Sequence, residues 1–177
     1  MKLTSNEALK MIKDFRKELG NPYWVDHSVC VGNTAGVIAK ALEEKGYNVD
    51  VDKASALGYV HDIGKYNGKD HGHAMSGYKY LKEKGYDDDY CNVCLTHSYL
   101  NNDIKCTAGG IPDPNDNPFL TDFIKNHEYT LEEKIVNLCD LMCPHGGKVF
   151  TVDKRLIDII LRLSLIHISE PTRLALI

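Results

Sequence analysis

Apolar residues recur at helical spacing along most of the chain, and no stretch shows the sustained alternation of a half-buried strand. The sequence therefore predicts an all-α fold, a bundle of about six to eight helices. A first helix is expected over about residues 6–19, with Thr4 or Ser5 as its cap and Gly20 at its end. A second helix is expected over about residues 25–45.

Cap and breaker residues predict the remaining elements. Asp52 is expected to cap a third helix that ends near Gly64, followed by helices over about residues 72–84 and 88–100. Residues 101–118 are rich in Gly, Pro, Asp and Asn, which predicts a long loop that could close over a substrate. The capping-box pattern from Thr130 to Glu133 predicts a helix to about residue 143, and a last helix begins near residue 152.

Composition indicates one domain and narrows its surroundings. The chain of 177 residues is 43% hydrophobic and carries no repeat or linker, which predicts a single core. A net charge of −4 argues against long nucleic acids as partners, and no apolar run is long enough to span a membrane. Without an export signal, the six cysteines are expected to be reduced thiols in the cytoplasm. Cys91 and Cys94 lack a second pair, so we expect buried core residues rather than zinc ligands.

The C-terminal segment stands apart from this pattern. Residues 163–173 resemble the in-frame translation of a transposase-based sequencing adapter. The resemblance implies that native sequence ends near Arg162. We therefore expect a domain over residues 1–162 and a non-native tail over residues 163–177, and we leave the tail with its His167 out of functional reasoning.

Three candidate helices carry polar side chains on their apolar faces. His27 shares a face with Val31, and His61, followed by Asp62, continues the apolar face of the third helix. Asp140 lies on the apolar face of a later helix, where a carboxylate is costly unless it is paired or bound to a metal. Imidazole and carboxylate groups from separate elements are the ligands that a hydrolytic divalent metal site needs.

These residues resemble the H…HD…D pattern of the HD superfamily, with His61 to Lys65 reading as its HDIGK variant. The resemblance implies a helical bundle with His27, His61, Asp62 and Asp140 around a metal. It also implies hydrolysis of a phosphoester or phosphoanhydride bond in a small phosphorylated substrate, such as a nucleotide. His73 and His97 fall where binuclear members hold a second metal, with Asp62 as the bridge.

The resemblance also implies roles for individual residues. One or two divalent ions, of Mn, Fe, Co, Ni or Zn, would activate the attacking water, with Asp62 as a catalytic ligand. Lys65 could hold a substrate phosphate oxygen, or it could be a solvated lysine at a helix end. Lys105, in the long loop, is expected to bind substrate. Three further histidines are weaker candidates or surface residues: His71, His127 and His145.

Other functions and substrates remain open at this point. Some HD-related proteins use a di-iron pair for oxygenation, and others are regulatory nucleotide-binding domains without turnover. Residues 130–140 are similar to the corresponding part of HD-type dinucleoside tetraphosphate hydrolases. Nucleoside monophosphates, cyclic nucleotides and signalling nucleotides are the alternative substrates.

Overall fold

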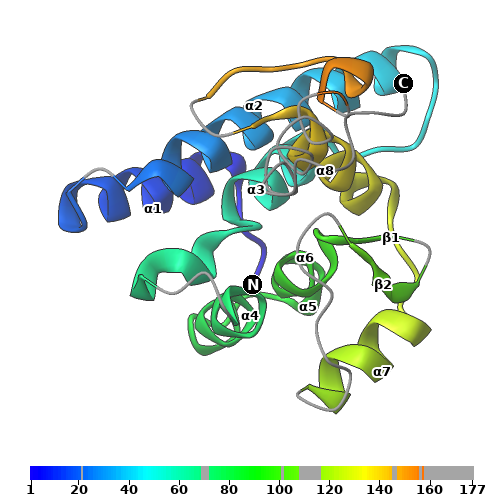
Figure 1. The fold of residues 1–177 in the computed structure, drawn as a ribbon. Helices are drawn as coiled ribbons and strands as arrows, with labels where there is room; N and C mark the ends of the chain where they lie inside the picture. The colour runs from blue at the N-terminus through cyan, green and yellow to red at the C-terminus, as the bar shows by residue number, and fades with distance from the viewer. Residues whose placement is uncertain are drawn as a thin grey trace, which may run out of the picture.

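Helices make up most of the structure, a computed structural model that describes residues 1–20, 22–68, 72–100, 102–107, 117–144, 147–155 and 157. This confirms the predicted all-helical class (Figure 1). The expected tail over residues 163–177 lies outside the described residues, whereas residues 152–155 are helical, where a last helix was expected to begin.

Four helices build most of the main core: α1 (Ser5–Glu18), α2 (Tyr23–Glu44), α3 (Val51–Val60) and α8 (Leu131–Met142). Buried residues from the segment between α3 and α8 join the same core: Ile63, Leu81, Tyr90, Cys91, Val93 and Cys94. Thr4 and Thr130 cap α1 and α8, each through a reciprocal capping box, as the sequence predicts. Apolar side chains on the facing stripes of these helices are fully buried, among them Ile12, Val31, Leu57 and Val136. This packing fixes the frame in which the functional side chains lie.

The cap of α3 differs from the prediction. Asp50, and not Asp52, accepts a hydrogen bond from the backbone N–H of Lys53, at 2.9 Å. Asp52 instead accepts hydrogen bonds from the backbone N–H and the hydroxyl of Ser5. Asp52 therefore joins the start of α1 to the start of α3, a tertiary role that local pattern does not reveal.

Between α3 and α8 the chain forms mostly shorter elements (Figure 1). They are the 3-10 helix η1 (Ile63–Asn67), α4 (His73–Glu83), α5 (Asp88–Cys91), α6 (Val93–Thr96), β1 (Tyr99–Leu100), β2 (Asp103–Thr107) and α7 (Pro118–Asn126). β1 and β2 form an antiparallel hairpin. A smaller hydrophobic cluster joins α6, the hairpin and α7: Leu95, Tyr99, Ile104, Leu120 and Ile124.

Two predictions for this region were wrong in detail, and one helix was not predicted. The single helix expected over residues 88–100 is two short helices followed by β1, because Tyr99 pairs with β2 and packs in the smaller cluster. The loop expected over residues 101–118 contains β2, and residues 108–116 lie outside the described residues. The sequence pattern did not predict α7, although Asn117 caps it and Pro118 occupies its first turn.

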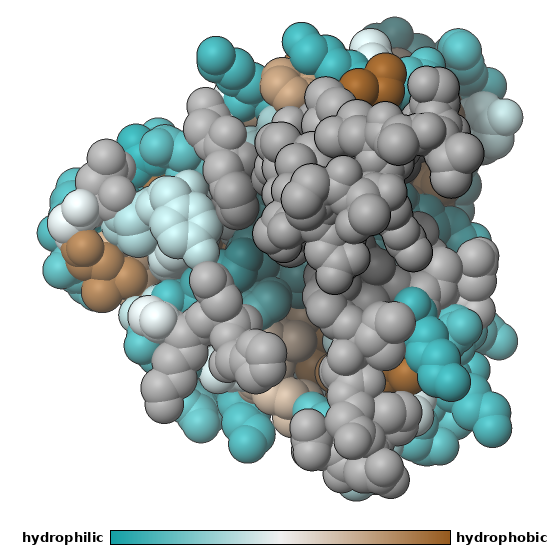
Figure 2. All heavy atoms as spheres, in the orientation of Figure 1, coloured by the Kyte–Doolittle hydropathy of each residue, from teal (hydrophilic) through white to brown (hydrophobic). Residues whose placement is uncertain are grey.

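The described residues visible in Figure 2 are mainly hydrophilic, with small separate apolar patches among them. No helix in the described part of the chain is long and apolar enough to cross a membrane. Five cysteines are free and buried, Cys91 and Cys94 among them, which confirms the prediction of core residues. The side chain of Cys106 lies outside the description.

Candidate metal centre

A first group of possible ligands joins three elements of the main core. His27 projects from α2, His61 caps the C-terminus of α3, and Asp140 lies on the last turns of α8. The Nε2 atom of His27 lies 2.9 Å from Oδ1 of Asp140 and 3.2 Å from Nε2 of His61. Ligand atoms of these three residues lie within 4.8 Å of one another, a spacing that suits one metal ion.

A second group meets the first through Asp62. It comprises Asp62 itself, which precedes η1, His73 at the first residue of α4, and His97 directly after α6. Oδ1 of Asp62 lies 3.3 Å from Nε2 of His73 and 3.6 Å from Nε2 of His97. Its other oxygen, Oδ2, lies 3.6 Å from His61 and 3.8 Å from His27. The two oxygens of one carboxylate thus face two different ligand groups.

Backbone carbonyls orient three of the imidazole rings. The Nδ1 atoms of His27, His61 and His97 lie 2.7 Å, 2.7 Å and 3.1 Å from the carbonyl oxygens of Cys143, Gly58 and Val93, respectively. Because a carbonyl only accepts hydrogen bonds, each Nδ1 atom carries a proton and each Nε2 atom faces the carboxylates, where a ring without a second proton offers its lone pair to a metal. Metal-binding histidines are held in this way, with the outer ring nitrogen donating to the protein.

The short contact between the Nε2 atoms of His27 and His61 indicates that a positive charge, either a second proton or a metal ion, belongs between the two rings. With both Nδ1 atoms protonated, two Nε2 atoms 3.2 Å apart form a hydrogen bond only if one ring takes a second proton. Burial opposes that proton, but the charge of Asp62 and the hydrogen bond to Asp140 outweigh it and raise the pKa of His61. The same negative surroundings suit a divalent ion, so the donor set fits a metal.

The carboxylates and the second group complete the electrostatic picture. Burial works against ionisation of Asp62, but the charge of His61 and the hydrogen bond from His73 hold its pKa well below the usual range. For Asp140, hydrogen bonds from His27 and His61 likewise overcome burial and lower the pKa. Burial lowers the pKa of His97 to about 3, so its ring is neutral and its Nε2 lone pair is available to a metal.

α4, which begins with His73 of the second group, packs closely against η1 and α6 because two glycines lie at these contacts. A Cβ atom on Gly64 would overlap the carbonyl oxygen of His73 and come within 2.5 Å of the backbone nitrogen of Gly77. A Cβ atom on Gly77 would lie 2.9 Å from Sγ of Cys94, which packs from α6. Real Cβ atoms essentially never approach so closely, so the glycine of the HDIGK segment is needed for α4 to pass beside η1.

The predicted substrate residues differ in position. Nζ of Lys65 lies 2.6 Å from Oδ2 of Asp62, at the edge of the first group. Lys105 is exposed on β2, and the described residues show no contact between it and the ligand groups. Its role in substrate binding stays a prediction.

The other histidines do not join the ligand groups in the described structure. His71 and His145 lie outside the described residues. His127 is not the surface residue that was expected. Its ring is mostly buried, stacks on Phe123 and lies 2.8 Å from a carboxylate oxygen of Glu133.

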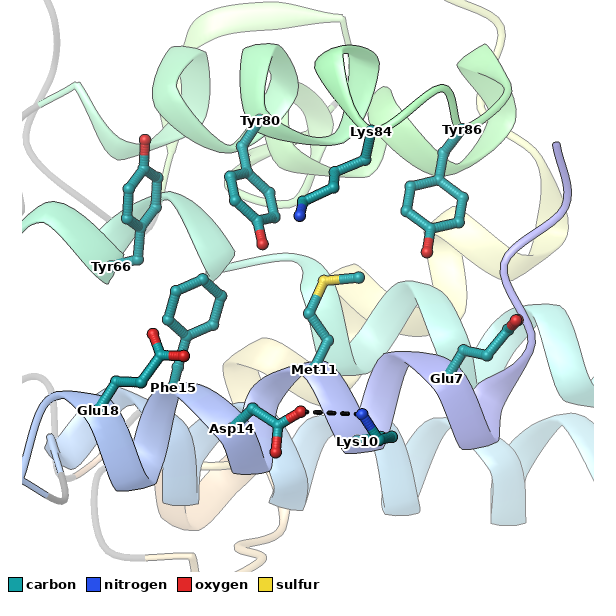
Figure 3. A pocket seen from close by; sticks show the side chains of 10 residues that line it. All are labelled: Glu7, Lys10, Met11, Asp14, Phe15, Glu18, Tyr66, Tyr80, Lys84 and Tyr86. Atoms are coloured by element: carbon teal, nitrogen blue, oxygen red, sulfur yellow. Dashed lines mark hydrogen bonds and ion pairs between the residues drawn. The ribbon is translucent and has the colours of Figure 1, made fainter.

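A separate groove lies between α1 and α4 (Figure 3). It has a volume of about 670 Å³ and contains none of the six ligand candidates. Phe15 and Met11 project from α1 toward Tyr80 and Tyr86, and Tyr66 of η1 stacks on Phe15 with ring centroids 5.7 Å apart. This aromatic contact fastens η1, which follows Asp62, to α1.

Two adjacent groups of His and Asp side chains that could hold metal ions, in a domain built mainly of helices, are typical of helical proteins with a metal site. Residues 24–143 match the HD domain family. The match covers well over half of the chain and includes all six ligand candidates, so the protein belongs to the HD domain family, whose members are generally metal-dependent hydrolases.

One relative among curated proteins is uncharacterized protein MJ0778 of Methanocaldococcus jannaschii, which is 34% identical over 93 residues. The alignment covers 51% of this chain and 52% of the relative, so the chain spans about half the length of the relative that it matches. No solved structure matches the chain significantly.

Proposed function

We propose that the protein is a binuclear metal-dependent phosphohydrolase that cleaves a phosphoester or phosphoanhydride bond in a small phosphorylated substrate, most simply a nucleotide. The observation that carries the proposal is the position of Asp62, whose two oxygens face the His27, His61 and Asp140 group on one side and the His73 and His97 pair on the other. A bridging carboxylate of this kind is typical of two-metal hydrolytic sites.

The residues of the chain divide the work of such a site. His27, His61 and Asp140 would hold one ion, His73 and His97 the other, and Asp62 both. Bound divalent ions withdraw charge from a phosphate oxygen and lower the pKa of a coordinated water toward neutrality. Lys65, whose ammonium group already lies beside Asp62, would place a fixed positive charge near the transferred phosphoryl group.

The nucleotide part of the proposal has separate support. Residues 130–140 are similar to the corresponding part of HD-type dinucleoside tetraphosphate hydrolases, and this segment includes the capping box of α8 and the ligand Asp140. The same binuclear chemistry can hydrolyse nucleoside monophosphates, cyclic nucleotides and signalling nucleotides. A substrate panel must therefore include these three kinds and dinucleoside tetraphosphates.

Elemental analysis combined with a phosphatase screen tests the proposal. The purified protein, with Mn, Fe, Co, Ni or Zn added back, is expected to hold about two ions per chain and to release phosphate from at least one nucleotide. Asp62→Ala should lose both ions and the activity, whereas Asp122→Ala, at an exposed position on α7, should lose neither.

Two results would contradict the proposal and favour another function. Metal binding with oxygen consumption and no phosphate release would favour a di-iron oxygenase. Nucleotide binding without turnover under any metal would favour a regulatory domain.

A further inference from the structure

One face of α8 carries a member of the first ligand group and contacts the segment that carries His97 of the second. Glu133, Asn137 and Asp140 are spaced four and then three residues apart, so they share one side of the helix. Asp140 contributes to the first ligand group. Glu133 and Asn137 contact the segment from Thr96 to Tyr99, which carries His97 of the second group. In Figure 1, α8 and α6 lie next to each other beside the hairpin.

Glu133 holds this segment through a buried carboxylate. Its Oε1 atom accepts a hydrogen bond from the hydroxyl of Thr96 at 3.1 Å and lies 2.8 Å from Nε2 of His127. Its Oε2 atom accepts hydrogen bonds from the backbone N–H and the hydroxyl of Thr130, at 2.9 Å and 3.1 Å. Glu133 is only 2% exposed, and every one of these contacts offsets the cost of burying its charge.

Asn137 holds the same segment one turn further along α8. Its Nδ2 atom donates to the carbonyl oxygens of Thr96 and Tyr99, at 3.4 Å and 3.3 Å, so the backbone is held on both sides of His97. The buried amide oxygen has no hydrogen-bond donor among the described residues, and leaving it unpaired costs stability. An apolar side chain of similar size would not carry this cost. The use of this amide therefore lies in its two backbone contacts.

We propose that Glu133 and Asn137 are positioning residues that hold His97 of the second ligand group in place relative to Asp140 of the first. They fix the backbone around His97 to the helix that carries Asp140, and they touch neither the ligand atoms of the first group nor those of the second. The inference rests on the proposed binuclear function and names the contacts that hold the second ligand group against α8. Of these contacts, the hydrogen bond from the Thr96 hydroxyl to Glu133 can be removed with the smallest change in side-chain shape.

Substitutions at Thr96 test the proposal. Thr96→Val removes the hydroxyl with little change of shape, while Glu133 keeps its contacts with His127 and Thr130. We expect one of the two ions to bind about tenfold more weakly, and kcat to fall more than KM changes. Thr96→Ser keeps the hydroxyl and should restore both. Asn137→Leu, which removes the two amide contacts, should weaken the same ion and serves if Thr96→Val does not fold.

A matched control separates positioning from general stability. Thr130→Val removes the hydroxyl that donates to the other oxygen of Glu133 and caps the backbone N–H of Glu133, while the backbone N–H of Thr130 still donates to that oxygen. The change should therefore lower Tm while metal affinity stays at the wild-type value. Wild-type affinity for both ions in Thr96→Val and in Asn137→Leu would overturn the positioning role alone. So would an equal loss of affinity in Thr130→Val. A wild-type protein that binds no metal would overturn the proposed function, and this inference with it.

Discussion

The two ligand groups are built by different parts of the molecule. His27 and His61 project from α2 and α3 inside the main core, where neither side chain is more than 8% exposed. His73 begins α4 and is 22% exposed, and His97 follows a helix of only four residues. Exposure alone does not separate the groups, since Asp140 is 21% exposed and His97 only 3%. The difference lies in the packing: α2, α3 and α8, which carry the first group, pack extensively on one another. The second group lies on or next to η1, α4 and α6, which contact one another more than they contact those helices.

Asp62 joins these unequal halves, since one of its oxygens faces each group. If the first group is part of the core and the second is docked onto it, damage to the first should affect folding as well as chemistry. Damage to the second should change metal content while leaving the core intact. The following predictions test that difference, from the largest expected effect to the smallest.

His27→Ala and His73→Ala compare the two groups directly. His27→Ala removes a ligand and also leaves the carbonyl oxygen of Cys143 without its donor, so we expect loss of activity by more than about 100-fold and a lower free energy of unfolding, by roughly 2–4 kcal/mol. His73→Ala should lose activity with a smaller change in stability. Phosphate release and chemical denaturation measure both effects, and equal destabilisation by the two changes would refute the comparison.

Metal removal should loosen the second group more than the first. At metal concentrations about 100 times Kd, binding contributes roughly 2.7 kcal/mol of stability, which a chelator removes. Hydrogen exchange should then speed up first in α4 and α6, while α2 and α3 stay protected because their packing does not need the ion. Uniform loss of protection across all four helices would show that the second group is not separately docked.

Gly64→Ala should break the second group selectively. The added methyl group must displace the start of α4, at a cost of about 1–3 kcal/mol, and His73 moves with it. We expect metal content to fall by about half, because the first group does not use α4. Lys79→Ala, at an exposed position of the same helix, should change neither metal content nor stability. Full metal content in Gly64→Ala would contradict the tight contact.

Lys65→Met gives the smallest expected effect. The change keeps the length of the side chain and removes the charge beside Asp62, so kcat/KM should fall about tenfold, or roughly 1.4 kcal/mol. The same change at the exposed Lys105 tests its predicted substrate role, since a lysine that does not reach the substrate should show less than about a twofold effect. A larger loss at Lys105 than at Lys65 would bring β2 to the substrate and support the role first expected for that lysine.

Sequence pattern predicted the long helices well because each carries its own information. The caps of α1 and α8 and the apolar stripes of the four core helices are local signals, and all of them appear in the structure. The hairpin and the break between α5 and α6 depend on the smaller hydrophobic cluster, which unites residues far apart in sequence. No local sequence period marks Tyr99 as a strand residue, so the hairpin could not be predicted without the tertiary contacts that the structure shows.

The candidate site shows the same division. The six ligand candidates follow a family pattern, and the structure brings their side chains together in two groups. The contacts of Glu133 and Asn137 were not anticipated, because Glu133 reads from sequence as half of a capping box. Its second task, the bond to Thr96, exists only once α6 lies against α8. A buried acid at a helix start is the signal that could have drawn attention to it.

The close contact between η1 and α4 limits which substitutions the sequence can accept at Gly64 and Gly77. Gly64 and Gly77 face each other with room for no side chain on either, so no enlargement at one can be balanced by a reduction at the other. In a saturation library these two positions should reject even alanine, whereas the neighbouring buried Ile63 should accept other aliphatic residues. The absence of a side chain at Gly64, within the HDIGK segment, is thus required by the position of α4, which begins nine residues later in the chain.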